Sequence, residues 1–210
     1  MSARTIAIEG PDGTGKATQT EKLKEQLIKD GHIVVSISFP RYDTAIGRKI
    51  RQAVFDPKKV SKPFEMAKLF YEDRKAALPF ILNAVDKNNF VIFDRYKYSS
   101  IAHQASKVEN SERRKLISKI EYMEKDIPGA DLVIFLSLPV ELSQKLLKKE
   151  KKRDLHENDI DYLRRTEKIY EQLAKRKNWI KIECARSGKL LSIENIHEKI
   201  YNEVKKFFGI

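Results

Sequence analysis

Residues 9–19 read Glu-Gly-Pro-Asp-Gly-Thr-Gly-Lys-Ala-Thr-Gln, and they indicate phosphate chemistry more directly than any other segment. Gly10, Gly15 and Lys16 have the G-x-x-x-x-G-K spacing of a phosphate-binding loop. Glycines allow backbone N–H groups to face phosphate oxygens, and the start of a following helix favours the same negative charge. Lys16 adds a positive charge for the outer phosphates. The segment therefore predicts a nucleotide-binding site.

The residue after Lys16 is Ala17, whereas the commonest form of this loop has a Ser or Thr whose hydroxyl binds Mg²⁺. Phosphate binding does not depend on that hydroxyl, so the predicted nucleotide site stands. We expect Thr18, or water molecules held by carboxylates, to make the contact with the metal instead.

Two arginines directly follow apolar runs that are typical of β-strands. Arg41 lies in the segment Phe-Pro-Arg-Tyr at 39–42, and Arg95 lies in the segment Asp-Arg-Tyr at 94–96. The ends of parallel strands meet at one edge of a sheet, where the phosphate-binding loop also lies. Because the planar guanidinium group suits a phosphate, both arginines are predicted to bind one. Asp94 can orient a Mg²⁺-bound water or hold Arg95 in place.

Taken in order along the chain, these segments resemble the thymidylate kinase family. The pattern at 9–19 is followed by Phe-Pro-Arg-Tyr at 39–42 and by Asp-Arg-Tyr-x-x-Ser-x-x-Ala at 94–102. Between them the family has a helix with Leu-Phe-x-x-x-Arg, to which Phe70 and Arg74 correspond. These two residues lie four apart and so share one face of a helix. The agreement extends over nearly the whole chain.

The resemblance implies a nucleoside-monophosphate kinase that transfers the γ-phosphoryl group of ATP to dTMP, giving dTDP and ADP on the way to dTTP. Mg²⁺ would bridge the ATP phosphates. In the family, the residue at the position of Phe70 stacks on the thymine ring, and the residue at the position of Arg74 binds a base carbonyl. Lys16 would then hold ATP, while Arg41 and Arg95 would hold the acceptor phosphate.

The predicted site residues form four groups. The predicted catalytic residues are Lys16, Arg95, Arg153 and Asp12, the last because the family aspartate at its position approaches the acceptor sugar or its metal. The predicted ATP site comprises Gly10, Asp12, Gly13, Thr14, Gly15, Lys16, Ala17, Thr18 and Arg186. The predicted acceptor site comprises Phe39, Arg41, Phe70, Arg74, Arg95, Ser99, Ser100, His103 and Glu157. Asp12 and Asp94 are the predicted carboxylates for Mg²⁺, acting through water.

Residues 145–158 resemble the mobile lid of the family, in which acidic residues follow a basic loop. Family members with a small residue at the position of Gly13 supply the catalytic arginine from this lid. The resemblance therefore makes Arg153 the first candidate for that role and Lys152 the second. Glu157 lies at the place of the family's lid glutamate, near the acceptor nucleotide.

His103, Ser100 and Ser137 depart from the family pattern, and Arg186 concerns the adenine site. His103 stands where the family usually has Tyr or Phe to crowd out a ribose 2′-hydroxyl, so selection between deoxyribo- and ribonucleotides stays open. Ser100 occupies a place where the base edge is read. Ser137 replaces an aspartate that is more structural than catalytic. In the segment 185–188, Arg186 is the candidate to stack on adenine.

The elements that must position these residues can be predicted from hydrophobic periodicity. Apolar runs typical of strands lie at Thr5–Glu9, Ile33–Phe39, Phe90–Asp94, Leu132–Leu136 and Trp179–Glu183. Helical patterns lie near 16–29, 64–87, 98–125, 140–150, 159–177 and 192–207. This alternation predicts an α/β fold, namely a P-loop NTPase-like three-layer α/β/α domain with a five-stranded parallel sheet. Pro79 predicts a kink or a break in its helix.

Composition sets the remaining expectations. The 210 residues are 41% hydrophobic and 34% charged, which predicts a single domain over 1–210, without a membrane span or signal peptide. The lone Cys184 fits a reducing cytoplasm, as a buried residue of a C-terminal strand. The net charge of +12 is spread among glutamates, so we expect solvated surface and nucleotide partners, not nucleic acid. The family is commonly homodimeric, and the stretch 64–87 is apolar enough to form the interface.

Three alternatives remain open at this stage. The first is another small-molecule kinase on the same scaffold, such as a deoxynucleoside kinase or a UMP/CMP-type kinase. The second is a nucleotide-binding protein without catalytic activity that binds nucleic acid through its positive charge, and the third is a related fold that has lost activity. The pair Phe70 and Arg74, together with Phe-Pro-Arg at 39–41, favours thymidylate as the acceptor.

Overall fold

The computed structural model describes residues 3–56, 62–147 and 159–210. Its centre is a five-stranded sheet in which every neighbouring pair of strands is parallel, as the alternation of elements predicts. The strands are β1 (Arg4–Glu9), β2 (Val34–Ser38), β3 (Phe90–Asp94), β4 (Leu132–Ser137) and β5 (Trp179–Glu183). Their order across the sheet is β2-β3-β1-β4-β5.

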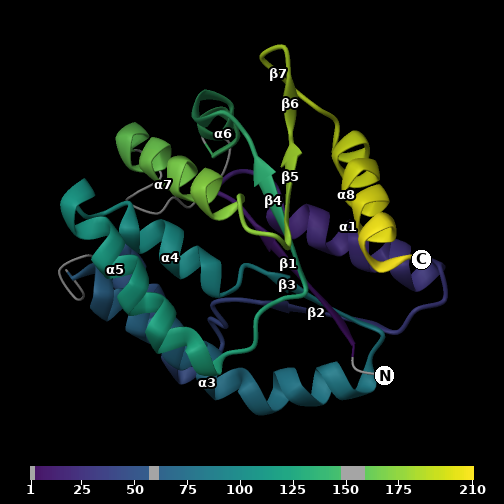
Figure 1. Ribbon diagram of the computed structural model, residues 1–210, viewed down its shortest axis with the longest axis horizontal. Helices are drawn as coiled ribbons and strands as arrows, with labels where there is room; N and C mark the ends of the chain where they lie inside the picture. The colour runs from purple at the N-terminus through teal and green to yellow at the C-terminus, as the bar shows by residue number, and fades with distance from the viewer. Residues whose placement is uncertain (1–2, 57–61, 148–158) are drawn as a thin grey trace.

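Helices cover both faces of the sheet and make three layers (Figure 1). On one face lie α1 (Lys16–Lys29) and α8 (Ile193–Phe208), and on the other lie α3 (Pro63–Lys87), α4 (Lys97–Ala105), α5 (Asn110–Met123) and α7 (Ile160–Leu173). The described chain also contains α2 (Ala45–Phe55), the 3-10 turn η1 (Glu124–Asp126), α6 (Val140–Leu147) and a short hairpin of β6 (Ala185–Arg186) and β7 (Lys189–Leu190). The predicted three-layer P-loop NTPase-like fold is confirmed.

The core forms because successive residues of each strand point to opposite faces. In β1, Ile6 and Ile8 are buried against Leu23 and Leu27 of α1, whereas Ala7 joins the core beneath α3, α4 and α7. Since both faces are covered, β3 and β4 are apolar almost throughout and the other strands contain several apolar residues, which is why the strands were recognisable.

The predicted helical stretch at 98–125 is wrong as a single helix, because it forms α4 and α5 with Ser106–Glu109 between them. The side chain of Arg113 stabilises this connection. Its Nε donates to the carbonyl of Ala105 at 3.1 Å, and its Nη2 donates to the carbonyl of Val108 at 3.3 Å. These carbonyls would otherwise lack partners where the helix stops.

Two further differences concern helices. The sequence patterns predicted no helix at α2, which begins where Thr44 accepts a hydrogen bond from the Gly47 N–H at 2.9 Å. Of the two outcomes predicted at Pro79, a break does not occur, because α3 continues through it. Pro79 is exposed, so water can replace the backbone hydrogen bond that proline cannot make.

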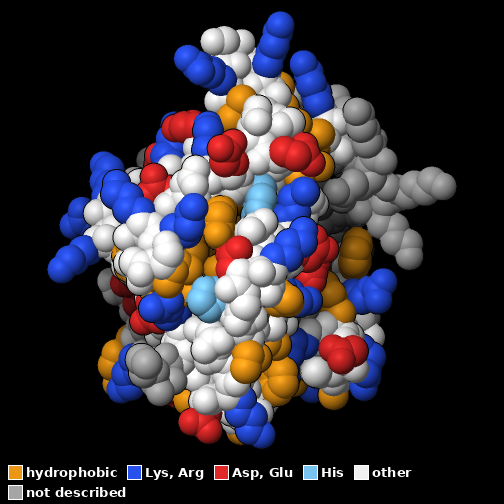
Figure 2. All heavy atoms as spheres, turned by 90° about the vertical axis from the view of Figure 1, so that its right-hand side faces the viewer, with side chains coloured by type: hydrophobic (Ala, Val, Ile, Leu, Met, Phe, Trp, Pro, Cys, Tyr) orange, Lys and Arg blue, Asp and Glu red, His pale blue; other side chains and the backbone are white. Residues whose placement is uncertain are grey.

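Surface charge is spread evenly on the face formed by α1 and α8. Figure 2 shows Lys and Arg side chains distributed over it, with Asp and Glu side chains among them. Cys184 is buried one residue beyond β5, and burial raises the pKa of its thiol to about 12. Within the three described ranges, no helix has both the length and the apolar character needed to span a membrane.

Candidate active site

The predicted site residues gather at the carboxyl edge of the sheet, around the end of β1. Ligands of such folds bind where neighbouring strands connect in opposite directions. Here β1 lies between β3 and β4, so the loop after β1 and the residues after β3 are brought together. The sequence separates these segments by about eighty residues, and only the parallel pairing makes them one site.

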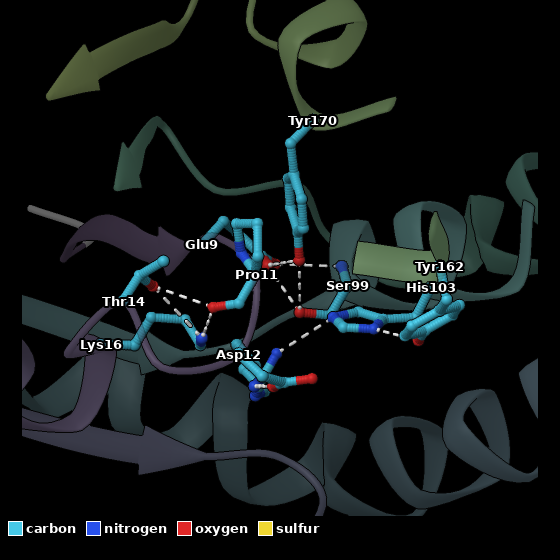
Figure 3. A network of polar contacts seen from close by, with 10 residues as sticks. Glu9, Pro11, Asp12, Thr14, Lys16, Ser99, His103, Tyr162 and Tyr170 are labelled. Carbon is cyan, nitrogen blue, oxygen red and sulfur yellow. Dashed lines mark hydrogen bonds and ion pairs between the residues drawn. The ribbon is translucent and has the colours of Figure 1, made fainter. Parts of the chain in front are cut away.

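The phosphate-binding loop has the conformation that its glycines predict. Gly10 has a φ of 149°, and a Cβ there would lie 2.7 Å from the Leu136 carbonyl oxygen, so only glycine fits. Gly15 has a φ of 83° and caps α1, leaving the first N–H groups of the helix for a ligand. Lys16 is buried, and its Nζ donates to the Pro11 carbonyl at 2.6 Å (Figure 3).

Burial and the nearby Arg95 lower the pKa of Lys16 to about 8, while Asp12, Asp94 and Glu9 oppose this shift. The three carboxylates are therefore close enough to act on the ammonium group. A phosphate beside Lys16 would favour its charged form more strongly than the protein does alone.

Arg95 and Asp12 form an ion pair across the end of β1, with Arg95 Nη2 donating to the Asp12 carboxylate. Burial opposes ionisation of Asp12, but attraction to Arg95, His103 and Lys16 lowers its pKa below the usual range. The backbone N–H of Arg95 donates to the Ile8 carbonyl at 3.1 Å, which ties this residue to β1. A guanidinium group is thus held directly beside the phosphate-binding loop.

His103 continues this arrangement from α4. Its Nε2 lies 3.4 Å from Arg95 Nη1, and its Nδ1 lies 2.7 Å from the hydroxyl of Tyr162 on α7. Burial lowers the pKa of His103 to about 3, with Arg95 and Lys16 acting in the same direction and Asp12 against it. The imidazole is therefore neutral at physiological pH.

Glu9 is the site residue that sequence reasoning missed most clearly. Its fully buried carboxylate accepts from the Ser99 hydroxyl at 2.6 Å and the Tyr170 hydroxyl at 3.0 Å (Figure 3). It also accepts from the Tyr96 N–H at 2.8 Å. Burial raises its pKa despite these hydrogen bonds. The signal available in the sequence was a carboxylate directly after the apolar run Ile6-Ala7-Ile8 of β1.

A pocket with a cavity volume of about 140 Å³ opens beside Arg95. It brings together most of the predicted acceptor-site residues, namely Phe39, Phe70, Arg74, Arg95, Ser99, Ser100 and His103. Asp12 lines the same pocket, and so do Gln104 and Tyr162, which were not predicted. Most of the residues predicted for the acceptor from separate motifs therefore line one cavity in the structure.

A second part of the pocket lining is built around Arg74, whose side chain is 2% exposed. Arg74 forms an ion pair with the buried Glu124, to which Nε donates at 3.1 Å, and its Nη2 donates to the Ser100 hydroxyl at 2.7 Å. Gln104 lies one helical turn after Ser100, and its buried Oε1 has no hydrogen-bond partner among the described residues. This part offers fixed donors and one acceptor beside the aromatic ring of Phe70.

The side chain of Arg41 does not line this pocket. Its backbone N–H and its Nε donate to the Asp73 carboxylate at 2.9 and 3.0 Å, and Nη2 donates to the Asp73 carbonyl at 2.8 Å. In this structure its guanidinium joins the loop after β2 to α3 instead of facing the cavity.

The carboxylates near the loop fit a magnesium ion held chiefly by phosphate oxygens and water. Asp12 and Asp94 both act on Lys16, so both lie on the phosphate side of the site. Thr18 is exposed in the first turn of α1. Across residues 3–56, 62–147 and 159–210, no three His, Cys, Asp or Glu side chains converge on a metal site. Kinase magnesium sites commonly use one or two carboxylates with substrate phosphates, which matches this donor set.

Some predicted residues cannot be placed in the pocket. Arg153, Lys152 and Glu157 lie outside the described residues. Arg186 is exposed on β6, in the hairpin after β5, and does not line the cavity. Ser137 is buried at the end of β4, which agrees with a structural position.

Comparisons with known proteins agree with this geometry. A family model described as thymidylate kinase matches residues 8–200. A probable thymidylate kinase of Methanosphaera stadtmanae is 36% identical over 98% of this chain and 99% of its own. A probable thymidylate kinase of Pyrococcus abyssi is 32% identical over 98% of this chain and 97% of its own. The solved thymidylate kinase of Candida albicans has a TM-score of 0.81 and 22% identity, covering 98% of this chain and 92% of that chain, which shows a shared fold.

Proposed function

Because the chain belongs to the thymidylate kinase family, we propose that it transfers the γ-phosphoryl group of ATP to dTMP. One observation carries the proposal. Arg95, beside the phosphate-binding loop, and Arg74, beside the ring of Phe70, line the same pocket. A nucleoside monophosphate has a phosphate at one end and a base at the other, so this pocket matches its two ends.

ATP is assigned to the loop between β1 and α1. The N–H groups at the start of α1 and the ammonium group of Lys16 would hold its phosphates. Lys16 donates to the Pro11 carbonyl in this structure, so a phosphate oxygen would replace a neutral acceptor with a charged one. The exposed Arg186 remains our candidate for stacking on adenine.

Arg95 is assigned to the acceptor phosphate. An oxygen of the dTMP phosphate attacks the γ-phosphorus, the bond to the β–γ bridging oxygen breaks, and ADP leaves with those electrons. Such a reaction depends on alignment and on positive charge around the migrating group. Asp12 orients Arg95 through the ion pair, and Lys16 approaches the group from the donor side.

The base end of the pocket suits thymine. Arg74 is held by Glu124 and Ser100, so its donors are fixed before a ligand binds and can meet a base carbonyl. The unpaired Oε1 of Gln104 can accept the N3–H of thymine, which supplies the missing partner of a buried acceptor. Phe70 offers an apolar ring for the base to stack on.

Magnesium and a lid residue complete the proposal. Asp12 and Asp94 would hold Mg²⁺ through water, with Thr18 as the candidate hydroxyl in the first turn of α1, and the ion would neutralise charge on the ATP phosphates. Arg153 is proposed to approach the transferring group from the segment 145–158.

We also propose a cytoplasmic homodimer that binds no nucleic acid. Phe80 of α3 is 51% exposed and supports an apolar contact there, which sedimentation would test.

The test is ADP release by the purified protein with MgATP and one of dTMP, dUMP, UMP, CMP or AMP. We expect selective turnover of dTMP and weaker turnover of dUMP, with Lys16→Ala as the inactive control. Comparable turnover of UMP or CMP would assign a different acceptor and would locate the relaxed selection at His103. No turnover with any acceptor, while ATP still binds, would indicate a nucleotide-binding protein instead of a kinase.

A further inference from the structure

A line of polar contacts connects α7 with the phosphate-binding loop. The hydroxyl of Tyr162 lies 2.7 Å from His103 Nδ1, His103 Nε2 lies 3.4 Å from Arg95 Nη1, and Arg95 donates to Asp12. Figure 3 shows Tyr162 and His103 next to each other on the side of the site opposite Lys16. The loop after β1, the stretch from the end of β3 into α4, and α7 are joined in this way.

The chemistry of the groups fixes the direction of these hydrogen bonds. A guanidinium group can only donate, so His103 Nε2 must accept from Arg95. A neutral imidazole carries its proton on the other nitrogen, so His103 Nδ1 donates to the Tyr162 oxygen. Asp12, Arg95, Lys16 and Lys107 are the charged groups that act on His103, and with burial they keep it neutral.

We propose that Tyr162 is a positioning residue. Its hydroxyl accepts from His103 Nδ1–H and so stabilises the tautomer whose Nε2 holds the Arg95 guanidinium toward the acceptor phosphate. This inference rests on the proposed function. In the other tautomer an N–H on Nε2 would face the N–H groups of Arg95, and two donors would be opposed.

The surroundings of Tyr162 are suited to this role. Its side chain is only 4% exposed and packs with Val140 and Leu163, so its hydroxyl is held in place. Tyr170, two turns later on α7, contacts the His103 ring edge-on with centroids 6.2 Å apart. The imidazole is therefore contacted from one helix by two tyrosines, of which Tyr162 hydrogen-bonds Nδ1 and Tyr170 packs against the ring.

The experiment compares Tyr162→Phe, His103→Phe and the double variant, each of which removes a polar group while keeping a ring. Tyr201→Phe is the matched control, because the Tyr201 hydroxyl also makes a 2.7 Å hydrogen bond, to Asp30 on the opposite face. The kcat and the KM values for MgATP and dTMP are measured separately for every protein.

We expect Tyr162→Phe to lower kcat about tenfold, with the KM for MgATP within twofold of the wild type. In the His103→Phe background the same change should alter kcat by less than twofold, because the contact between the hydroxyl and His103 is already lost. Tyr201→Phe should match the wild type. A kcat equal to that of the wild type in Tyr162→Phe would overturn the proposal. An equal loss of kcat with and without His103 would overturn it too, because such a loss indicates a packing role for Tyr162.

Imidazole ¹⁵N NMR tests the same inference without turnover. The resonances of His103 are identified by their loss in His103→Phe. We expect one Nδ1–H tautomer in the wild type and a mixture in Tyr162→Phe, and a wild-type Nε2–H tautomer would refute the proposal. If the wild type does not phosphorylate dTMP, the proposed function fails, and with it the role of Tyr162 in phosphoryl transfer. The NMR measurement would still show which tautomer of His103 is stabilised by Tyr162.

Discussion

Arg95 shows how a single residue of this site combines conformation and charge. Its φ of 62° lies in the left-handed region, which costs a residue with a Cβ about 1 kcal/mol or more. The hydrogen bond to Ile8 and the ion pair with Asp12 offset that cost. The unusual backbone turns the side chain from the end of β3 across the end of β1.

Replacing Arg95 should therefore affect turnover more than stability. We expect Arg95→Ala to lower kcat for dTMP by a factor of about 100 to 1,000, the range found when one preorganised donor to a transition state is removed. Arg95→Lys should recover only part of this loss, because lysine keeps the charge but not the planar pair of donors. Steady-state kinetics would measure both. A kcat close to that of the wild type in Arg95→Ala would refute the assigned role.

Gln104 allows a second prediction, because its Oε1 is buried without a described partner. Gln104→Leu removes this unsatisfied atom and should raise Tm or leave it unchanged. The same change should raise the KM for dTMP about tenfold, since a hydrogen bond to the base is lost. Thermal unfolding and kinetics would be measured on the same preparation. A lower Tm together with an unchanged KM would show that Gln104 supports the fold instead of the base.

The site residues that the sequence predicted lie in short local motifs, and the roles of most of them come from the resemblance of those motifs to the family. Lys16 lies in a loop motif, and Phe70 and Arg74 lie on one helix face. Glu9 and Tyr170 meet across 161 positions, so no local pattern could pair them. The unpaired state of Gln104 and the contact of Arg41 with Asp73 depend equally on tertiary packing.

At the scale of elements, α2 depends on a close approach of two backbones. A Cβ at Gly47 would lie 1.8 Å from the Arg41 carbonyl oxygen. The same loop carries the pair between Arg41 and Asp73, so the start of α2 and the end of β2 are fixed together. This contact limits how far the loop beside Phe39 can move.

Gly47→Ala should consequently displace this loop and lower the free energy of unfolding by about 3 kcal/mol. Gly129→Ala is the matched control, because its Cβ would come no closer than 3.6 Å to Tyr98 and its φ is not positive. We expect the control to change stability by less than about 0.5 kcal/mol. Urea unfolding would measure both variants. Equal stability of the two would show that the loop adjusts without cost.

The elements could be predicted to differing extents for physical reasons. The strands were recognisable because the sheet is covered on both faces, so that β3 and β4 are apolar almost throughout and the other strands contain several apolar residues. The division between α4 and α5 depends on a side chain of the second helix, Arg113, which stabilises the end of the first. The helical pattern of α2 is short in the sequence, and the position of this helix depends on the tertiary contact between Gly47 and Arg41.

At the scale of the whole molecule, the buried His103 makes the free energy of unfolding depend on pH in the acidic range. His103 is neutral when folded, with a pKa of about 3, against about 6.5 in the unfolded chain. Between these values the unfolded state binds one more proton than the folded state. The free energy of unfolding therefore falls as pH falls from about 6.5.

His103→Phe removes this proton difference, so the variant should lose stability less steeply than the wild type between pH 6 and pH 4. The difference in slope should be at most about 1.4 kcal/mol per pH unit. The raised pKa of Glu9 acts in the opposite direction in both proteins and cancels in the comparison. Denaturant unfolding at several pH values would measure the slopes. Parallel slopes would show that His103 is protonated in the folded protein.

The depressed pKa of Lys16 makes nucleotide binding a proton-coupled process. Near pH 8 about half of the molecules carry an uncharged Lys16, and a bound phosphate restores the charge. Each binding event should then take up to about half a proton from the buffer at that pH. The measured heat of ATP binding would vary with the ionisation enthalpy of the buffer, so calorimetry in two buffers would count the protons directly.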